Sequence, residues 1–489
     1  MTLFLDQVVS SAGNWVFWIV VSRLSTTDQI GEAIAIYSLV LFVSTLTQLG
    51  LEYPLLKKAA TEGRRILGSA LLVESAITSI AVVIVLSMVW NGAYHESLQI
   101  FAWIAILILV TSAMMFISRF VLLGIFKVRE VFIFDIIGTA MKFVVAYFLL
   151  TFGFGAGALL TSFVIQNTVT CLGSMLVIFR TVGLPRMRDF GGQQVHYIAN
   201  VIKLALVNTP SKLSRALIIS LSVVLITFLG VADSEIGIFY IVLMISVIAG
   251  SFASSIAVML IPANSPIRTM EGDGEVVNTR TSGTSSVMFV TSLRVGLCLS
   301  VPFIGLMVAA PTAVLGLLGE QYLSAGSMLV VLSISIFPQT LVMNAISQLN
   351  TLHQMRKIVF IGIMQAVVFL IAFFVLVPLY GTLGAAYAIL FAYAIASIPS
   401  LLWYERAAVR YVAYSGVAIV SGVVVAFVAR SIIISSVTAT LSPSVESLLM
   451  AASSSITALV VILLTRCLSV GEIIQLGKTA IRTSMHGSA

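Results

Sequence analysis

Residues 358–403 read IVFIGIMQAVVFLIAFFVLVPLYGTLGAAYAILFAYAIASIPSLLW and contain no aspartate, glutamate, lysine or arginine. The stretch divides at Gly381 into two apolar runs, each close to the roughly 20 residues that a helix needs to cross the hydrocarbon of a bilayer. The apolar residues are continuous and do not alternate with polar ones, so they predict helices and not the strands of a barrel. We therefore expect two membrane-spanning helices joined by a tight turn.

The whole chain continues this pattern. It has 489 residues, of which 60% are hydrophobic and 9% are charged, whereas a soluble domain carries roughly 25% charged residues. The composition predicts an all-α polytopic membrane protein with about fourteen transmembrane helices. The first apolar segment lacks a basic n-region and a cleavage site, so we expect a retained span. The expected spans are 4–22, 33–51, 67–90, 98–123, 132–152, 156–179, 211–230, 236–261, 285–310, 323–349, 358–379, 382–403, 411–433 and 445–467.

The lysines and arginines predict the orientation of these spans. Loops after odd-numbered spans hold only Arg23 and Arg430, whereas loops after even-numbered spans and the C-terminal tail hold most of the others. Basic loops remain on the cytoplasmic side, so we expect a multi-pass protein of the cytoplasmic membrane with both termini in the cytoplasm. The net charge of +7 follows from these loops, and we expect no nucleic-acid partner.

Motifs for enzymatic or metal chemistry are missing from the sequence. Cys171, Cys298 and Cys467 lie inside apolar runs without metal-ligand spacing, which favours small core side chains and predicts no metal site. No Gly-rich phosphate loop is followed by Lys and Ser or Thr, so the chain is not expected to be an ATPase. We expect a protein that is not an enzyme and that uses no cofactor.

Three pairs of short segments indicate an internal repeat. The pairs are 28–31 (DQIG) with 234–237 (SEIG), 127–129 (KVR) with 354–356 (QMR), and 153–158 (GFGAGA) with 381–386 (GTLGAA). Their common order predicts two parallel six-helix lobes with two further helices, although helix hairpins also use glycine at unrelated turns. The expected division is an N-terminal lobe at 1–194, a C-terminal lobe at 195–405, a two-helix segment at 406–470 and a cytoplasmic tail at 471–489.

Three further motifs resemble those of one transporter family. The first is Arg23-Leu24-Ser25, with Gln29-Ile30-Gly31 and Gln48-Leu49-Gly50-Leu51 after it. The second is Leu317-Leu318-Gly319-Glu320-Gln321-Tyr322, and the third is Val377-Pro378-Leu379-Tyr380-Gly381 followed by Leu383-Gly384-Ala385-Ala386. Together they resemble the polysaccharide flippase branch of the multidrug/oligosaccharidyl-lipid/polysaccharide (MOP) exporter superfamily. The likeness covers most of residues 8–403.

This resemblance implies a fold, a mechanism and a substrate class. The fold would be two six-helix bundles around a central cavity that opens alternately to the two sides of the membrane. The substrate would be a polyprenyl-pyrophosphate-linked oligosaccharide, and the partners would be membrane lipids and a glycan polymerase or ligase, with no oligomer required. One departure concerns residues 212–215 (KLSR), where many members carry an acidic residue, so a coupling carboxylate is in doubt there.

Basic residues inside the expected spans are candidates for binding the anionic head of such a substrate. An ionisable side chain in the hydrocarbon is costly, so it should face a cavity, a partner or the interface. Arginine offers paired hydrogen bonds to phosphate, and lysine offers a compact charge. The alternatives are side chains that reach back to the interface, or structural ion pairs between helices. The candidates are Arg294, Lys142, Arg119, Lys212 and Arg215.

Acidic and amide side chains inside the spans are further candidates. Glu74 and Asp135 could couple transport to an ion, with a buried pair as the alternative. Asn14, Asn167, Asn344 and Gln348 could contact sugar hydroxyls, although hydrogen bonds between helices are the commoner use of such residues.

These sequence features discriminate among four candidate functions. The sequence favours a flippase that moves a lipid-linked oligosaccharide from the inner to the outer leaflet by alternating access. A cation-coupled multidrug exporter of the same superfamily is the first alternative, and basic intramembrane charge speaks against it. A membrane-embedded glycosyltransferase or polymerase would need a large loop or a catalytic carboxylate, and none stands out. A scaffold without transport would not need such costly charges in its spans.

Overall fold

The computed structural model describes residues 2–183, 198–263, 282–403 and 409–421, with gaps between 200 and 215, single-residue gaps elsewhere and isolated positions as far as 460. All regular elements in these ranges are helices. Nine of them are long and apolar enough to cross a membrane, or up to ten if one bent pair forms a single span. This confirms an all-α polytopic membrane protein. The expected spans at 411–433 and 445–467 lie largely outside the described residues.

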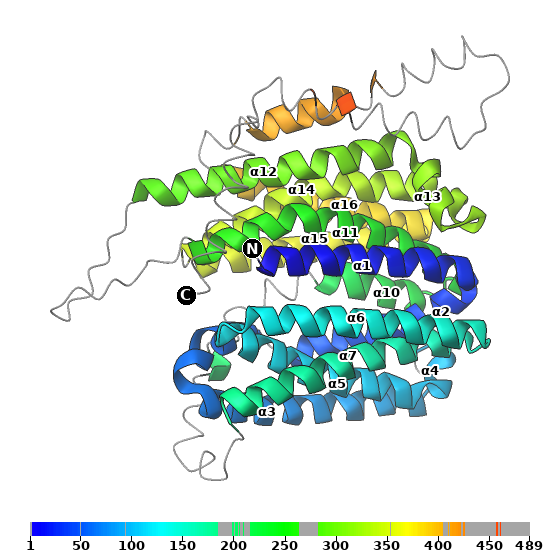
Figure 1. Cartoon of the computed structure of the whole chain (residues 1–489). Helices are drawn as coiled ribbons and strands as arrows, with labels where there is room; N and C mark the ends of the chain where they lie inside the picture. The colour runs from blue at the N-terminus through cyan, green and yellow to red at the C-terminus, as the bar shows by residue number, and fades with distance from the viewer. Residues whose placement is uncertain are drawn as a thin grey trace.

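The helices form two groups in chain order. In Figure 1 most of the first group lies in the lower half and most of the second in the upper half, with the first helix, α1, and α10 between them. Most helices pack mainly on helices of their own group. α1 and α2 are the exceptions, because both also pack on α11 of the second group. The first group is α1 (Thr2–Leu24), α2 (Thr27–Thr47), α3 (Glu52–Trp90), α4 (Ser97–Ile100), α5 (Ala102–Gly124), α6 (Val128–Thr151) and α7 (Gly155–Thr181). The second is η2 (Leu217–Leu221), α10 (Ser222–Phe228), α11 (Asp233–Ala263), α12 (Ser282–Ala309), α13 (Pro311–Leu318), η3 (Glu320–Ala325), α14 (Gly326–Thr351), α15 (Met355–Tyr380) and α16 (Thr382–Leu402).

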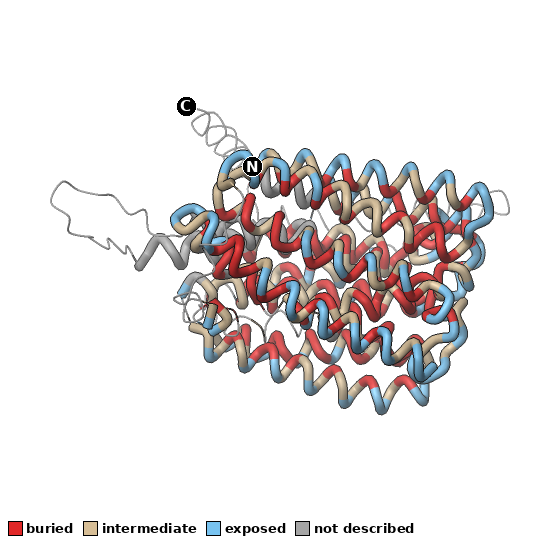
Figure 2. The backbone as a smooth tube through the Cα atoms, turned by 90° about the horizontal axis from the view of Figure 1, so that it is seen from below, coloured by how far each residue is buried: buried red, intermediate tan, exposed pale blue. Residues whose placement is uncertain are grey.

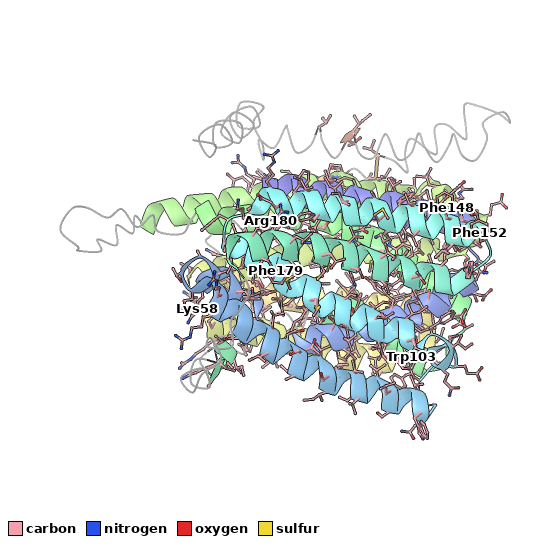
Figure 3. The ribbon with its side chains drawn as sticks, turned by 60° about the horizontal axis from the view of Figure 1, so that its bottom comes forward. Lys58, Trp103, Phe148, Phe152, Phe179 and Arg180 are labelled. Carbon is pink, nitrogen blue, oxygen red and sulfur yellow. The ribbon has the colours of Figure 1, made fainter. Side chains whose placement is uncertain are left out.

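The two ends of the helix bundle differ in chemistry. Figure 3 shows Lys58 and Arg180 at one end, and Trp103 and Phe152 at the other. We call these the basic end and the aromatic end. Trp103 and Phe152 are each 76% exposed, as expected for aromatic side chains at the level of lipid head groups.

The outer surface of the bundle is apolar as well as its interior. Figure 2 shows buried residues along the inner faces of the helices and exposed residues along the outer faces. The exposed positions include Ile80, Val83 and Ile371 at 62% to 65% exposure. An apolar outer surface of this extent matches contact with lipid and not with water.

The hairpin expected at 358–403 is present as α15 and α16. Gly381 joins them with φ 59° and ψ −138°, a backbone conformation that is open mainly to glycine. A Cβ added at Gly384 would lie 2.2 Å from the Leu376 carbonyl oxygen, so the two helices start in close contact.

Three helix boundaries differ from the sequence expectation. The helix of the second span begins at Thr27 and not at 33, because Thr26 and Gln29 form a capping box. α3 begins at Glu52 and not at 67, with non-helical angles at Gly63, because hydropathy marks only the apolar part of a helix. Residues 311–318, expected to be a loop, form α13, which is bent by 86° from α12 and has Pro311 in its first turn.

The crossing of α2 and α11 relates the two groups of helices. A Cβ added at Gly31 would lie 1.8 Å from the Asp233 carbonyl oxygen, and one at Gly237 would lie 2.3 Å from that of Thr27. In the repeat inferred from the sequence, Gly31 corresponds to Gly237 and Thr27 to Asp233. Gly31 therefore packs on Asp233, and Gly237 packs on Thr27, which is the equivalent of Asp233 in the repeat. Such reciprocal contacts are those of two units related by a two-fold axis. The exact lobe boundaries remain a prediction.

Candidate substrate path and the contacts that close it

The two groups of helices meet where α1 and α2 pack on α11, and we call this boundary the seam. Lys142 is a buried basic residue near the seam. It lies on α6 and is 2% exposed. Its Nζ donates a 2.7 Å hydrogen bond to Asn14 Oδ1 on α1. The same Nζ lies 4.2 Å from the ring centre of Phe17 and 5.5 Å from that of Phe163. Ring faces and one amide oxygen are weak compensation for burying an ammonium, so this position carries a cost that function could explain.

An aromatic cluster surrounds Lys142 and crosses the seam. Trp18 on α1 meets Tyr240 on α11 edge-on, with ring centres 5.2 Å apart. Tyr37 on α2 stacks on Phe163 at 3.9 Å. Phe17 and Trp18 follow Asn14 along α1 towards the aromatic end. The rings therefore cover Lys142 on that side in this conformation.

The candidate acidic residues lie inside the first group. Arg119 Nη1 on α5 lies 2.6 Å from Asp135 Oδ2 on α6, so two candidates form an ion pair with each other. Thr47 Oγ1 on α2 lies 3.1 Å from Glu74 Oε1 on α3, and Glu74 is 1% exposed. Glu74 also lines a cavity of about 250 Å³ with Ser75 and Thr78.

The remaining candidates lie elsewhere in the fold. Asn167 Nδ2 donates to Ser112 Oγ at 2.8 Å, and Asn344 Nδ2 donates to the Thr340 carbonyl oxygen at 2.9 Å. Gln348 is half-buried on α14. The Arg294 guanidinium lies 5.4 Å from the ring centre of Tyr411, at the contact of α12 with the helix 411–421. Lys212 and Arg215 lie outside the described residues. The structure thus brings Asn14 together with Lys142, and Arg119 with Asp135.

An apolar cavity opens along the seam between α1 and the second group. It has a volume of about 380 Å³, and every residue that lines it is apolar, from Ala12 and Trp15 on α1 to Phe303 on α12 and Val314 on α13. Ser11 and Ser251 share a 2.9 Å hydrogen bond across the same seam. Such a cavity fits hydrocarbon and offers nothing to a polar head group.

Hydrogen bonds join α1 to the α13–η3 segment at the aromatic end. Arg23 Nη2 donates to the Gly316 carbonyl oxygen at 2.7 Å, and Arg23 Nε donates to that of Leu317 at 3.0 Å. Ser22 Oγ donates to the Leu318 carbonyl oxygen at 3.1 Å. Gln321 Nε2 donates in the other direction, to the Ser22 carbonyl oxygen at 3.0 Å.

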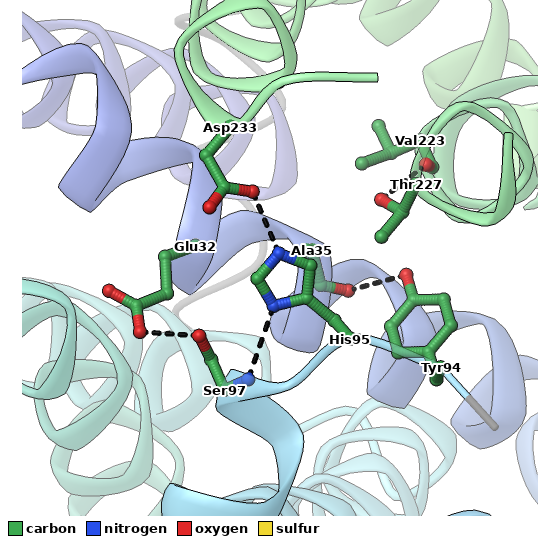
Figure 4. A network of polar contacts seen from close by, with 8 residues as sticks. All are labelled: Glu32, Ala35, Tyr94, His95, Ser97, Val223, Thr227 and Asp233. Carbon is green, nitrogen blue, oxygen red and sulfur yellow. Dashed lines mark hydrogen bonds and ion pairs between the residues drawn. The ribbon is translucent and has the colours of Figure 1, made fainter. Parts of the chain in front are cut away.

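A second set of contacts closes the same end around His95, as Figure 4 shows. His95 Nε2 lies 2.8 Å from Asp233 Oδ1 at the start of α11. Ser97 Oγ donates to Glu32 Oε1 on α2 at 2.5 Å, and Tyr94 Oη donates to the Ala35 carbonyl oxygen at 3.0 Å. The contact of His95 with Asp233 and the glycine crossing of α2 and α11 hold the two groups together at the aromatic end, while Tyr94 and Ser97 hold the segment of His95 on α2.

Sequence reasoning did not find the His95–Asp233 contact. Both residues lie in short turns outside the expected spans, where charge is unremarkable. The inferred repeat did align 28–31 with 234–237, but it gave no indication that these segments pack on each other or on residues 94–97. No group of three or more His, Cys, Asp or Glu side chains that could hold a metal occurs in the ranges that the structure describes.

Comparison with known proteins gives matches to solved structures. No family model matches the sequence, and no curated protein matches it. A structure of lipid II flippase MurJ in an inward closed conformation has a TM-score of 0.68 and 11% identity, over 95% of this chain and 99% of that chain. An inward-facing multidrug resistance MATE family transporter of the MOP superfamily has a TM-score of 0.61 and 15% identity, over 83% and 95%. A MATE structure in complex with MaL6 has a TM-score of 0.60 and 14% identity, over 84% and 95%.

At these identities the likeness concerns the fold and not the substrate. The matched structures are transporters, and they cover most of both groups of helices. This chain therefore has the helical transporter fold that MurJ and the MATE proteins share.

Proposed function

We propose that this protein flips a polyprenyl-pyrophosphate-linked oligosaccharide from the inner to the outer leaflet of the cytoplasmic membrane by alternating access. The observation that carries the proposal is Lys142, a basic residue buried between α1, α6 and α7 beside the aromatic cluster that reaches α11. A pyrophosphate must leave water on its way across, and a lysine in a dry site is a strong partner for it. The fold likeness to a lipid II flippase, over 95% of this chain, supports the same class of cargo.

The charge distribution supports an orientation for this movement. We place the basic end, with Lys58 and Arg180, in the cytoplasm by the positive-inside rule. The contacts of Arg23, Gln321 and His95 then lie on the outer side. This conformation would be closed to the outside, and the substrate would enter from the basic end.

The apolar cavity at the seam supports a lipid-linked cargo. A saccharide head can pass between the lobes only if its lipid chain remains in hydrocarbon throughout. The cavity between α1, α11, α12 and α13 is an apolar site next to the proposed path. A free sugar or a nucleotide sugar would have no use for it.

A cation-coupled multidrug exporter is the second candidate. The MATE structures share the fold, and the buried Glu74 beside its own cavity is the kind of carboxyl that could exchange a proton. A cationic drug, however, would be repelled by Lys142. Flipping of an anionic lipid and efflux of a cationic dye therefore separate the two candidates.

The test uses the purified protein in liposomes that contain a fluorescent polyprenyl-pyrophosphate oligosaccharide. The parent protein should expose the labelled head on the opposite leaflet, and Lys142→Met should lower the rate by about tenfold or more, the effect of losing one charge-assisted contact. Lys357→Met is the matched control, because Lys357 also lies over a ring, that of Trp403 at 5.1 Å, but at the basic end. No flipping by the parent, or equal rates in all three proteins, would contradict the proposal.

A further inference from the structure

Residues 94–97 form a short segment that binds elements of both groups, and we call it the strap. On the side of the first group, Tyr94 Oη donates to the Ala35 carbonyl oxygen and Ser97 Oγ donates to Glu32, both on α2. On the side of the second group, the Tyr94 ring meets that of Phe228 edge-on at 5.0 Å, and His95 reaches Asp233. Figure 4 shows the strap between these elements.

The contacts of the strap with α2 persist across the physiological pH range. Tyr94 is largely buried, and burial raises the pKa of its phenol above the usual value of about 10. The phenol therefore stays protonated and keeps donating at any physiological pH. Ser97 has no ionisable group, and its hydroxyl donates to Glu32.

The hold on α11 is different because it depends on histidine, the side chain that changes charge between about pH 5 and 8. The Ser97 backbone N–H donates to His95 Nδ1 at 3.3 Å. This assigns the proton of a neutral ring to Nε2, which faces Asp233 Oδ1 at 2.8 Å. The two contacts therefore fit a neutral imidazole whose Nε2–H donates to the Asp233 carboxylate.

Protonation of His95 changes this balance towards a tighter hold. It removes the long bond from Ser97 and places a positive charge on the donor of the short bond to the Asp233 carboxylate, so that this bond becomes an ion pair. The charged residues on the elements that the strap touches are all acidic. They are Asp28 and Glu32 on α2, Glu96 in the strap itself, and Asp233 and Glu235 on α11. α10 carries no charged residue, so no cation on these elements opposes an imidazolium.

We propose that the strap is a proton-sensitive latch, in which His95 holds α11 more tightly when the medium at the aromatic end is acidic. Acidification favours the closed aromatic end, and deprotonation of His95 weakens its hold on α11 while the strap stays on α2. The inference requires that the two groups move relative to each other, but it is independent of the cargo. The liposome assay can therefore show no flipping although the pH-dependent distance change is observed, and flipping can be observed without that change.

The test measures the width of the aromatic end in the full-length protein. Nitroxide labels on Phe152→Cys and Leu379→Cys report the distance between the groups, since both residues are exposed, at 76% and 69%, and lie outside the latch. Cys171 and Cys298 are buried and remain, and Cys467 is replaced by Ala. Electron–electron distances are recorded at about pH 5 and about pH 8 in lipid nanodiscs.

The parent should show a population of longer distances that rises by up to about fivefold from the acidic to the alkaline sample, the change expected when a partly exposed ion pair is lost. His95→Gln and Asp233→Asn should show the larger population at both pH values. Gln99→Ala, an exposed change on α4, should behave as the parent does. A parent without pH dependence, or pH dependence that survives in His95→Gln and Asp233→Asn, would overturn the latch.

Discussion

At the scale of single residues, the half-buried Arg119 and the buried Lys142 have different surroundings. Arg119 has a carboxylate partner in Asp135, so its position is explained by a structural pair between α5 and α6. Lys142 has one amide oxygen and two ring faces. Since a lysine with such partners does little for stability, Lys142 is the better candidate for contact with the substrate.

This difference predicts that removing the charge of Arg119 lowers the stability of the fold, whereas removing that of Lys142 does not. Arg119→Gln and Asp135→Asn should each lower the melting temperature of the protein in detergent. The double variant should lose less than the sum, with a coupling energy of about 0.5–3 kcal/mol for a contacting pair. Additive losses would show that the pair does not contribute.

The prediction for Lys142 is that stability and transport separate. Lys142→Met replaces a buried charge with an apolar chain of similar length, which is often neutral or stabilising. Combined with Asn14→Leu, which removes the amide left without its partner, the melting temperature should remain within a few degrees of the parent while flipping is lost. A large fall in the melting temperature would instead assign Lys142 to a structural role.

At the scale of elements, the crossing of α2 and α11 depends on two glycines with no room for a side chain. Gly31→Ala should force the helices apart at the aromatic end, because its Cβ would meet the Asp233 carbonyl oxygen at 1.8 Å. The expected result is faster labelling of a cysteine placed at Ser25, which is buried beside this crossing. Gly316→Ala is the control at the same end, since a Cβ there meets nothing within 4 Å. Unchanged labelling in Gly31→Ala would show that the crossing does not set the closed end.

The elements also show how far sequence reasoning reached. The hairpin at 358–403 was predictable because two apolar runs and a glycine turn leave few alternatives in a bilayer. The start of α3 at Glu52 was not, because its first turns carry charged residues that hydropathy excludes. The presence of α13 was not either, because an apolar run of eight residues is too short to indicate a span. The pairs of Asn14 with Lys142 and Arg119 with Asp135 join residues far apart in sequence, and only packing decides which helices meet.

At the scale of the whole molecule, the chain has the fold of MurJ and MATE transporters, with contacts between its two groups of helices at the aromatic end. The segments that the inferred repeat aligns, 28–31 and 234–237, pack on each other at Gly31 and Gly237. The substrate was not derivable from fold, because flippases and drug exporters share it. The proposed preference for an anionic cargo rests on Lys142, the basic residue buried between α1, α6 and α7.

The measurement that tests this account most directly is depletion of the protein in the cell that produces it. Lipid-linked oligosaccharides in each leaflet and efflux of a cationic dye would be followed together. The account predicts that oligosaccharide accumulates on the inner leaflet and disappears from the cell surface, while dye efflux is unchanged, and that Lys142→Met fails to restore surface glycan whereas Lys357→Met restores it. Normal surface glycan with lost dye efflux would contradict the account and favour a drug exporter.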